Sequence, residues 1–155
     1  MKVFISHKRE DSHIAVQIKN ELDRLQVSAY LDVLDDGISG KGKALTEHIK
    51  KQLNSCTDLI VVMSSSTYKS WWVPFEIGMS AQKDMPTVTF LSSTVSLPDY
   101  LEYWPRLRST LDIGKYVKVR KQYTNGLTFR GLNENMRMDS ASIPDFYEKL
   151  KRELR

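Results

Sequence analysis

The sequence predicts an α/β protein in which helices cover both faces of a mostly parallel sheet. Short apolar runs alternate along the chain with amphipathic helical stretches, and this alternation is typical of repeated strand–helix–strand units. The run Asp58–Ser64 (DLIVVMS) is apolar almost throughout, as expected for a central parallel strand buried on both faces. A chain of 155 residues has the size of one such domain, so we expect a single domain over residues 1–155.

The first half of the chain predicts two strands, each followed by a helix. The strand candidates are Lys2–Ser6 and Val27–Asp32. Apolar residues recur at helical spacing after each of them: Ile14, Ile18, Leu22 and Leu25 after the first, and Leu45, Ile49 and Leu53 after the second. Each helix therefore carries one apolar stripe that can pack on the sheet.

The second half predicts two more strands and a closing helix. Thr87–Leu91 (TVTFL) supplies a fourth strand, and Lys115–Val119 (KYVKV) predicts a fifth, shorter strand at an edge of the sheet. Near the end, Ser142 precedes Pro144, which is typical of a helix start. The apolar stripe of that last helix consists of Phe146, Leu150 and Leu154.

Composition and charge narrow the class of protein. The net charge is +4, but the 23 Lys and Arg residues are scattered among 19 acids, which favours a phosphate-bearing small molecule over nucleic acid. Cys56 is the only cysteine, so it predicts a small buried residue in a reducing compartment and excludes a disulfide framework. Because no signal peptide and no membrane-length apolar run is present, we expect a cytoplasmic protein that does not bind membranes.

Several familiar site chemistries do not fit the sequence. The stretch Gly37–Ala44 matches a phosphate-binding GxxxxGK loop, but Ala44 offers no hydroxyl for Mg²⁺ and the loop follows the second strand. No GxGxxG dinucleotide motif follows the first strand. The three histidines, His7, His13 and His48, lack the spacing of metal ligands, so no metal site is expected.

The ligand-binding edge of such a sheet lies beyond the carboxyl ends of its strands. Three segments fall there: Ser6–Arg9, Asp32–Lys43 and Ser64–Glu76. The last contains Trp71–Gly78 (WWVPFEIG), where Trp72 and Glu76 are four residues apart and share one face of a helix. Two interpretations of Glu76 remain open: an exposed acid favoured by the helix dipole, or a carboxylate held beside an aromatic wall.

The motifs at these strand ends resemble those of a Toll/interleukin-1 receptor (TIR) domain. They are FISHKRED (residues 4–11), AYLDVLDDGISGKG (29–42), DLIVVMSSSTYKSWW (58–72) and the Trp72–xxx–Glu76 spacing. The resemblance covers Met1–Leu91 firmly. It implies a flavodoxin-like three-layer sandwich with a five-stranded, mostly parallel sheet. The sequence is similar to those of stand-alone bacterial TIR proteins of the Thoeris type of anti-phage defence.

The resemblance implies an NAD⁺ nucleosidase that breaks the bond between nicotinamide and ribose. In enzymatic relatives the essential glutamate stands four residues after a tryptophan, which maps onto Trp72 and Glu76. A carboxylate hydrogen-bonded to the ribose hydroxyls stabilises the positive charge that develops as neutral nicotinamide leaves. NAD⁺ is then the substrate, with ADP-ribose or a cyclic ADP-ribose as the product, and no cofactor or metal is required.

The family's loop after the first strand maps onto Ser6, His7, Lys8 and Arg9. Lys8 and Arg9 are candidates for contact with the diphosphate, although solvated surface charge is the simpler interpretation of both. Relatives often carry an aromatic residue where this chain has His7, so stacking on the substrate there is in doubt. Asp32 ends the second strand as in the family and is a further binding candidate, unless it caps the following loop.

The resemblance also implies partners. The 33–43 loop corresponds to the one that reaches a neighbouring protomer in TIR assemblies, so we expect self-association, with a separate effector protein sensing the product. The alternative is a non-catalytic TIR interaction module or virulence mimic that binds through the same loop. A nucleoside deoxyribosyltransferase-like enzyme is a third possibility, but it accounts less well for the FISHKRED start.

Overall fold

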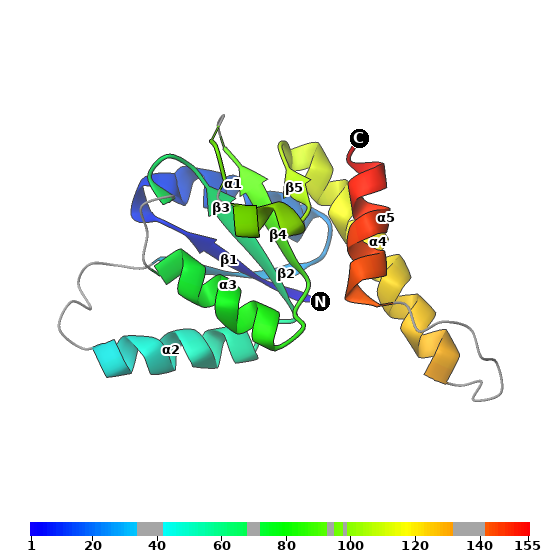
Figure 1. The fold of residues 1–155 in the computed structure, drawn as a ribbon, viewed down its shortest axis with the longest axis horizontal. Helices are drawn as coiled ribbons and strands as arrows, with labels where there is room; N and C mark the ends of the chain where they lie inside the picture. The colour runs from blue at the N-terminus through cyan, green and yellow to red at the C-terminus, as the bar shows by residue number, and fades with distance from the viewer. Residues whose placement is uncertain (34–41, 68–71, 93–94, 98, 132–141) are drawn as a thin grey trace.

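A five-stranded parallel sheet forms the centre of the molecule (Figure 1). The computed structural model describes residues 1–33, 42–67, 72–92, 95–97, 99–131 and 142–155. The strand order is β2-β1-β3-β4-β5, the doubly wound order of flavodoxin-like folds, and it confirms the predicted fold class. The strands are β1 (Lys2–His7), β2 (Ser28–Val33), β3 (Asp58–Met63), β4 (Thr87–Leu91) and β5 (Arg106–Leu107).

Helices cover both faces of the sheet (Figure 1). The helices α1 (Ser12–Arg24), α4 (Thr110–Gly131) and α5 (Ile143–Glu153) share one apolar core with the sheet. On the other face, α2 (Gly42–Asn54) and α3 (Trp72–Gln82) share a second core with it. Two short 3-10 helices complete the described elements, η1 (Arg9–Asp11) and η4 (Asp99–Tyr103).

The inner strand β1 contributes to both cores because its side chains alternate between the two faces of the sheet. Val3 and Ile5 pack in the core shared with α1, whereas Phe4 packs in the core shared with α2 and α3. Every residue of β3 is buried, as predicted for a central parallel strand. Cys56, just ahead of β3, is 5% exposed, and burial raises the pKa of its thiol, so its prediction as a buried residue is confirmed.

The predicted fifth strand at Lys115–Val119 is wrong, because this segment lies inside helix α4. The fifth strand is instead the two-residue β5, which pairs with β4 through Arg106 and Leu107. In α4 the buried residues Ile113, Tyr116 and Val117 follow helical spacing and pack against the sheet. Tertiary burial therefore overrides the local preference of KYVKV for a strand.

The closing helix α5 begins where the sequence predicts. Ser142 accepts a hydrogen bond from the amide of Asp145, and the Asp145 carboxylate accepts one from the amide of Ser142, which forms a capping box. The side chains of Phe146 and Leu150 are buried in the core shared with α1 and α4. Leu154 is partly buried against the same core, so the predicted apolar stripe is confirmed.

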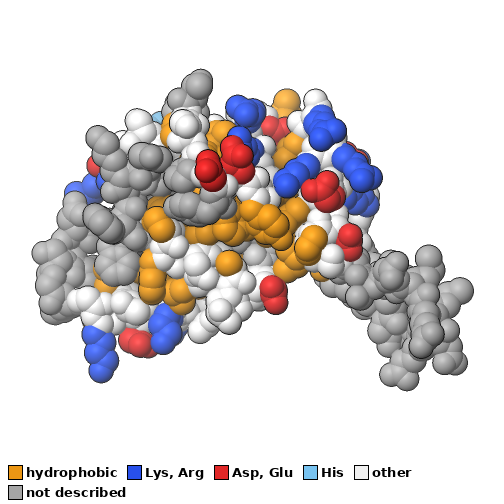
Figure 2. Space-filling model, in the orientation of Figure 1, with side chains coloured by type: hydrophobic (Ala, Val, Ile, Leu, Met, Phe, Trp, Pro, Cys, Tyr) orange, Lys and Arg blue, Asp and Glu red, His pale blue; other side chains and the backbone are white. Residues whose placement is uncertain are grey.

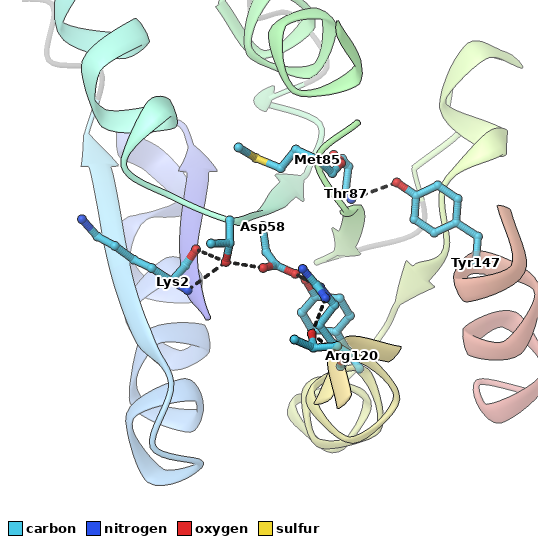
Figure 3. A network of polar contacts seen from close by, with 9 residues as sticks. Lys2, Asp58, Met85, Thr87, Arg120 and Tyr147 are labelled. Carbon is cyan, nitrogen blue, oxygen red and sulfur yellow. Dashed lines mark hydrogen bonds and ion pairs between the residues drawn. The ribbon is translucent and has the colours of Figure 1, made fainter. Parts of the chain in front are cut away.

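A polar cluster at the amino end of β3 ties this strand to α4 (Figure 3). The Asp58 carboxylate is fully buried and accepts hydrogen bonds from the Tyr116 hydroxyl at 2.6 Å and from Arg120 Nε at 2.7 Å. Burial and the neighbouring Asp58 charge raise the pKa of Tyr116 well above its ordinary value, so its hydroxyl remains a donor. Nearby, the Tyr147 hydroxyl of α5 accepts from the amide of Thr87 at 2.9 Å.

Figure 2 shows how side chains are distributed on one face of the molecule. Hydrophobic side chains gather in a band across its middle, and Lys and Arg side chains gather near the C-terminal end of α5 with acids among them. Positive charge on this face is therefore mixed with negative charge, in line with the pattern of the sequence. In the part of the chain that the structure describes, no helix is both long and apolar enough to cross a membrane.

Candidate active site

Helix α3 carries Glu76 on its inner face. The helix begins at Trp72, so Pro74 lies in the first turn, where backbone amides have no acceptor within the helix and a proline is tolerated. Val73, Ile77 and Ser80 are buried and mark the stripe that packs on the sheet. Glu76 belongs to the same buried surface and is 0% exposed.

The interpretation of Glu76 as a solvent-exposed acid is wrong. Burial of a carboxylate is unfavourable unless the protein compensates it, so a fully buried glutamate on the sheet-facing side of a helix is a candidate for function. The neighbouring Phe75 is 38% exposed and lies on the outer side of the helix. The side chains of Trp71 and Trp72 lie outside the described residues, so the aromatic wall stays a prediction.

Ser6 lies on the same face of the sheet as Glu76. It alternates with Ile5 along β1, and this directs its side chain toward the side covered by α2 and α3. Its hydroxyl is fully buried and has no hydrogen-bond partner among the described residues. The structure therefore places a buried carboxylate and an available hydroxyl in one layer, between the sheet and α3.

The other predicted binding residues lie on β1, on β2 and in the segment that follows β1. His7 is 1% exposed and alternates toward the α1 side, and its Nδ1 lies 3.2 Å from the carbonyl oxygen of Ile5. Lys8 is half-buried and Arg9 is exposed, at the start of η1. Asp32 lies directly opposite Ser6 in the register of β1 with β2, but its side chain is outside the described residues.

Asp11 forms a buried polar contact that sequence reasoning missed. Its Oδ2 accepts hydrogen bonds of 2.6 Å from the hydroxyls of Ser64 and Thr67, which follow β3. All three side chains are buried. FISHKRED contains Asp11 and SSST begins at Ser64, but a single sequence carries no signal that pairs residues so far apart. The two segments have in common that each follows an inner strand of the sheet, β1 for Asp11 and β3 for Ser64.

Within the described ranges, no group of three or more His, Cys, Asp or Glu side chains could hold a metal ion. Most of the loop predicted for self-association, residues 34–41, lies outside those ranges, as does most of the GxxxxGK stretch. The described site therefore consists of Glu76, Ser6 and the segment that follows β1.

Comparison with known proteins gives two curated bacterial relatives. One is "Putative cyclic ADP-D-ribose synthase TIR2" of Cytobacillus dafuensis, with 29% identity over 84 residues, covering 52% of this chain and 22% of the relative. The other is "Probable 3' cyclic ADP-D-ribose synthase ThsB'" of Bacillus cereus (strain MSX-D12), with 28% identity over 79 residues, covering 49% of this chain and 41% of the relative. The chain thus matches less than half the length of either relative.

A solved structure shares the fold. The TIR domain of the Toll-related receptor TRR-2 from Hydra magnipapillata aligns with a TM-score of 0.56 and 16% identity, over 88% of this chain and 98% of that one. At this identity the likeness concerns the fold alone. The TIR domain family itself matches residues 3–124, which include every described residue of the candidate site. The chain therefore belongs to the TIR domain family.

Proposed function

We propose that this protein is an NAD⁺-cleaving enzyme in which Glu76 is the catalytic carboxylate. The observation that supports this best is the position of Glu76: fully buried, on the sheet-facing side of α3, and on the same sheet face as the Ser6 hydroxyl. A TIR domain that served only for binding would have no use for a buried carboxylate there. The names of the two curated relatives, both cyclic ADP-D-ribose synthases, point to the same chemistry.

The proposed reaction breaks the bond between C1′ of the ribose and the nicotinamide nitrogen. The bonding electrons leave with nicotinamide, which departs as a neutral molecule, and positive charge develops on the ribosyl centre. The Glu76 carboxylate accepts hydrogen bonds from the ribose hydroxyls and stabilises this charge electrostatically. Capture by water, with loss of a proton, yields ADP-ribose, and capture by a group on the adenosine half yields a cyclic product. The names of the relatives favour the cyclic product.

The remaining candidates are proposed to bind rather than react. Ser6 offers its buried hydroxyl as a hydrogen-bonding group, and Lys8 and Arg9 offer positive charge for the diphosphate. Trp72 is proposed to wall the substrate, and Asp32 to contact it from the adjacent strand. Because the carboxylate is closed off from water in this structure, binding of NAD⁺ has to uncover it.

The proposed biological setting is bacterial anti-phage immunity of the Thoeris type. There the product acts as a signal, a separate effector protein senses it, and the enzyme works in the cytoplasm, where NAD⁺ is available. Self-association through the 33–43 loop is part of this proposal, so the specific activity should depend on protein concentration. No further partner is invoked.

The decisive variant is Glu76→Gln, which keeps the shape of the side chain and removes its charge. Wild-type protein should convert NAD⁺ to nicotinamide and ADP-ribose or a cyclic isomer, and the variant should be at least about a hundredfold slower, because it lacks the charge that stabilises the transition state. Chromatography with mass spectrometry, over a range of protein concentrations, resolves the products.

The matched control is Glu148→Gln, which makes the same change on the exposed side of α5 and should leave turnover unchanged. A thermal melt of each protein shows whether the fold is retained. If wild-type protein does not consume NAD⁺ even when concentrated or supplied with lysate of phage-infected cells, the assignment as an enzyme is wrong. The interaction module then becomes the better assignment.

A further inference from the structure

Asp11 occupies the N-cap position of α1, but its side chain does not cap the helix. At this position an aspartate ordinarily accepts a hydrogen bond from a backbone amide of the first turn. No such bond forms here, and Oδ2 accepts instead from the hydroxyls of Ser64 and Thr67, each at 2.6 Å. The residue is 5% exposed, so these contacts are made away from water, where such bonds are strong.

The segment that Asp11 contacts leads directly into the helix of Glu76. The hydroxyl oxygen of Ser64 accepts hydrogen bonds from the amides of Ser66 and Thr67, both at 3.1 Å, so this loop folds back on Ser64. Only residues 68–71 separate Thr67 from the first residue of α3. The Asp11 carboxylate therefore anchors the chain at Thr67, five positions before the first residue of α3.

The same residue is also joined to the segment that follows β1. Asp11 is the last residue of η1, and its amide donates to the carbonyl of Lys8 at 2.9 Å. Lys8 and Arg9 are the residues proposed to meet the diphosphate. Asp11 thus links the proposed binding segment to the loop ahead of the proposed catalytic helix, although 53 positions separate it from Ser64.

We propose that Asp11 is a positioning residue, which sets the start of α3, and hence Glu76, relative to the segment after β1. It contacts no substrate and acts through Thr67 and Ser64. The mechanical part of this role follows from the hydrogen bonds alone, whereas its kinetic consequence rests on the proposed cleavage of NAD⁺. A displacement of about 1 Å in a catalytic group can lower the rate by about a hundredfold, so loss of the link should be visible in turnover.

The link is tested by Thr67→Val, which keeps the shape of the side chain but removes the hydroxyl, and by Thr67→Ser, which keeps the hydroxyl. The matched control is Thr89→Val, because Thr89 is also buried and donates its hydroxyl to the carbonyl oxygen of Pro105, which lies outside α3. Hydrogen exchange is measured well below the melting temperature, at the amides of residues 76–79, the first that bond within α3. Exchange should be at least about tenfold faster in Thr67→Val and close to wild type in the other two variants.

The kinetic measurement follows the same variants. In Thr67→Val, kcat for NAD⁺ cleavage should fall by about tenfold with KM nearly unchanged, and Thr67→Ser should restore it. Asp11→Ala should lower kcat and also raise KM, because it releases both segments. Unchanged exchange in Thr67→Val, or equally fast exchange in Thr89→Val, overturns the positioning role. Absence of NAD⁺ cleavage by wild-type protein would instead contradict the proposed function, while the exchange rates would still decide whether Asp11 holds α3.

Discussion

Two fully buried carboxylates, Asp58 and Glu76, lie at different ends of the fold. Asp58 stands at the amino end of β3 and accepts hydrogen bonds from Tyr116 and Arg120, which compensate its charge. Glu76 lies in the second turn of α3, the helix that starts beyond the carboxyl ends of the strands (Figure 1). We therefore attribute a structural role to Asp58, whereas Glu76 keeps the catalytic role proposed above.

Tyr147 gives a residue-scale prediction about alkaline pH. Burial raises the pKa of its hydroxyl to about 12, against about 10 in an unfolded chain. Because the folded protein holds this proton more tightly, its contribution is complete below pH 10 and is lost as the pH rises toward 12. Between pH 9 and pH 11 wild-type protein should lose roughly 1 kcal/mol of unfolding free energy from this residue alone.

The comparison variant is Tyr147→Phe, studied by urea unfolding at pH 8 and pH 11. At pH 8 it should be less stable than wild type by about 1 kcal/mol, since the amide of Thr87 loses its acceptor. By pH 11 this difference should shrink or vanish, because the variant has no phenol to titrate. A difference that stays constant over this range would show that Tyr147 does not titrate as described.

At the scale of elements, the Asp58 cluster predicts how α4 is held to the sheet. Arg120→Met removes the guanidinium from a carboxylate that is 0% exposed, and we expect a loss of about 2 to 3 kcal/mol in the free energy of unfolding. The remaining hydrogen bonds, from the hydroxyls of Tyr116 and Thr57, keep the loss near the lower end of what such changes cause. Urea denaturation measures it.

The same variant separates stability from function. Since the cluster lies at the amino end of β3, Arg120→Met should cleave NAD⁺ at the wild-type rate well below its melting temperature. Lys118→Met, which changes an exposed lysine on the same helix, should alter stability by less than about 0.5 kcal/mol. A large loss of turnover in folded Arg120→Met would contradict the separation.

Four strands could be predicted from the sequence because their runs are apolar and are bounded by polar residues. The fifth could not. β5 has only two residues, Arg106 and Leu107, which is too short for any alternation to be visible. The segment Lys115–Val119 was predicted as a strand because a window of five residues shows only its β-branched residues. A wider window that includes Ile113 shows the helical spacing of the buried residues. Helical periodicity becomes visible only over several turns, in a window of roughly 11 to 18 residues.

The candidate site was predictable in part for a similar physical reason. The spacing of Trp72 and Glu76 and the position of Ser6 at the end of β1 are local features, and both can be read along the chain. The contact of Asp11 with Ser64 and Thr67 is created by the pairing of β1 with β3, which no local pattern encodes. The burial of Glu76 likewise depends on how α3 packs on the sheet.

At the scale of the whole molecule, the core extends beyond the segment that defines the family. The TIR family matches residues 3–124, yet Phe146, Tyr147 and Leu150 of α5 are buried in the core shared with α1 and α4. Each such side chain contributes about 1.5 to 3 kcal/mol through removal of its apolar surface from water. Their sum is comparable to the total stability of a domain of this size.

A chain that ends at Gly131 should therefore not fold cooperatively, although it retains the whole family segment. Circular dichroism and a proton NMR spectrum should show residual helix without dispersed side-chain signals, because the apolar surfaces of α1 and α4 lose their cover. Adding a peptide of residues 132–155 in excess should restore dispersion if loss of that packing is the cause. A truncated chain that melts sharply would contradict the role given to α5.

The brevity of β5 also bears on how the protein behaves at high concentration. An open sheet exposes backbone donors and acceptors along its outermost strands, and a long flat edge invites pairing with another molecule. Here that edge offers two residues, and Pro105 just before them has no amide proton to donate. At this side the molecule presents too little backbone to seed intermolecular sheet growth, even at the concentrations that tests of self-association require.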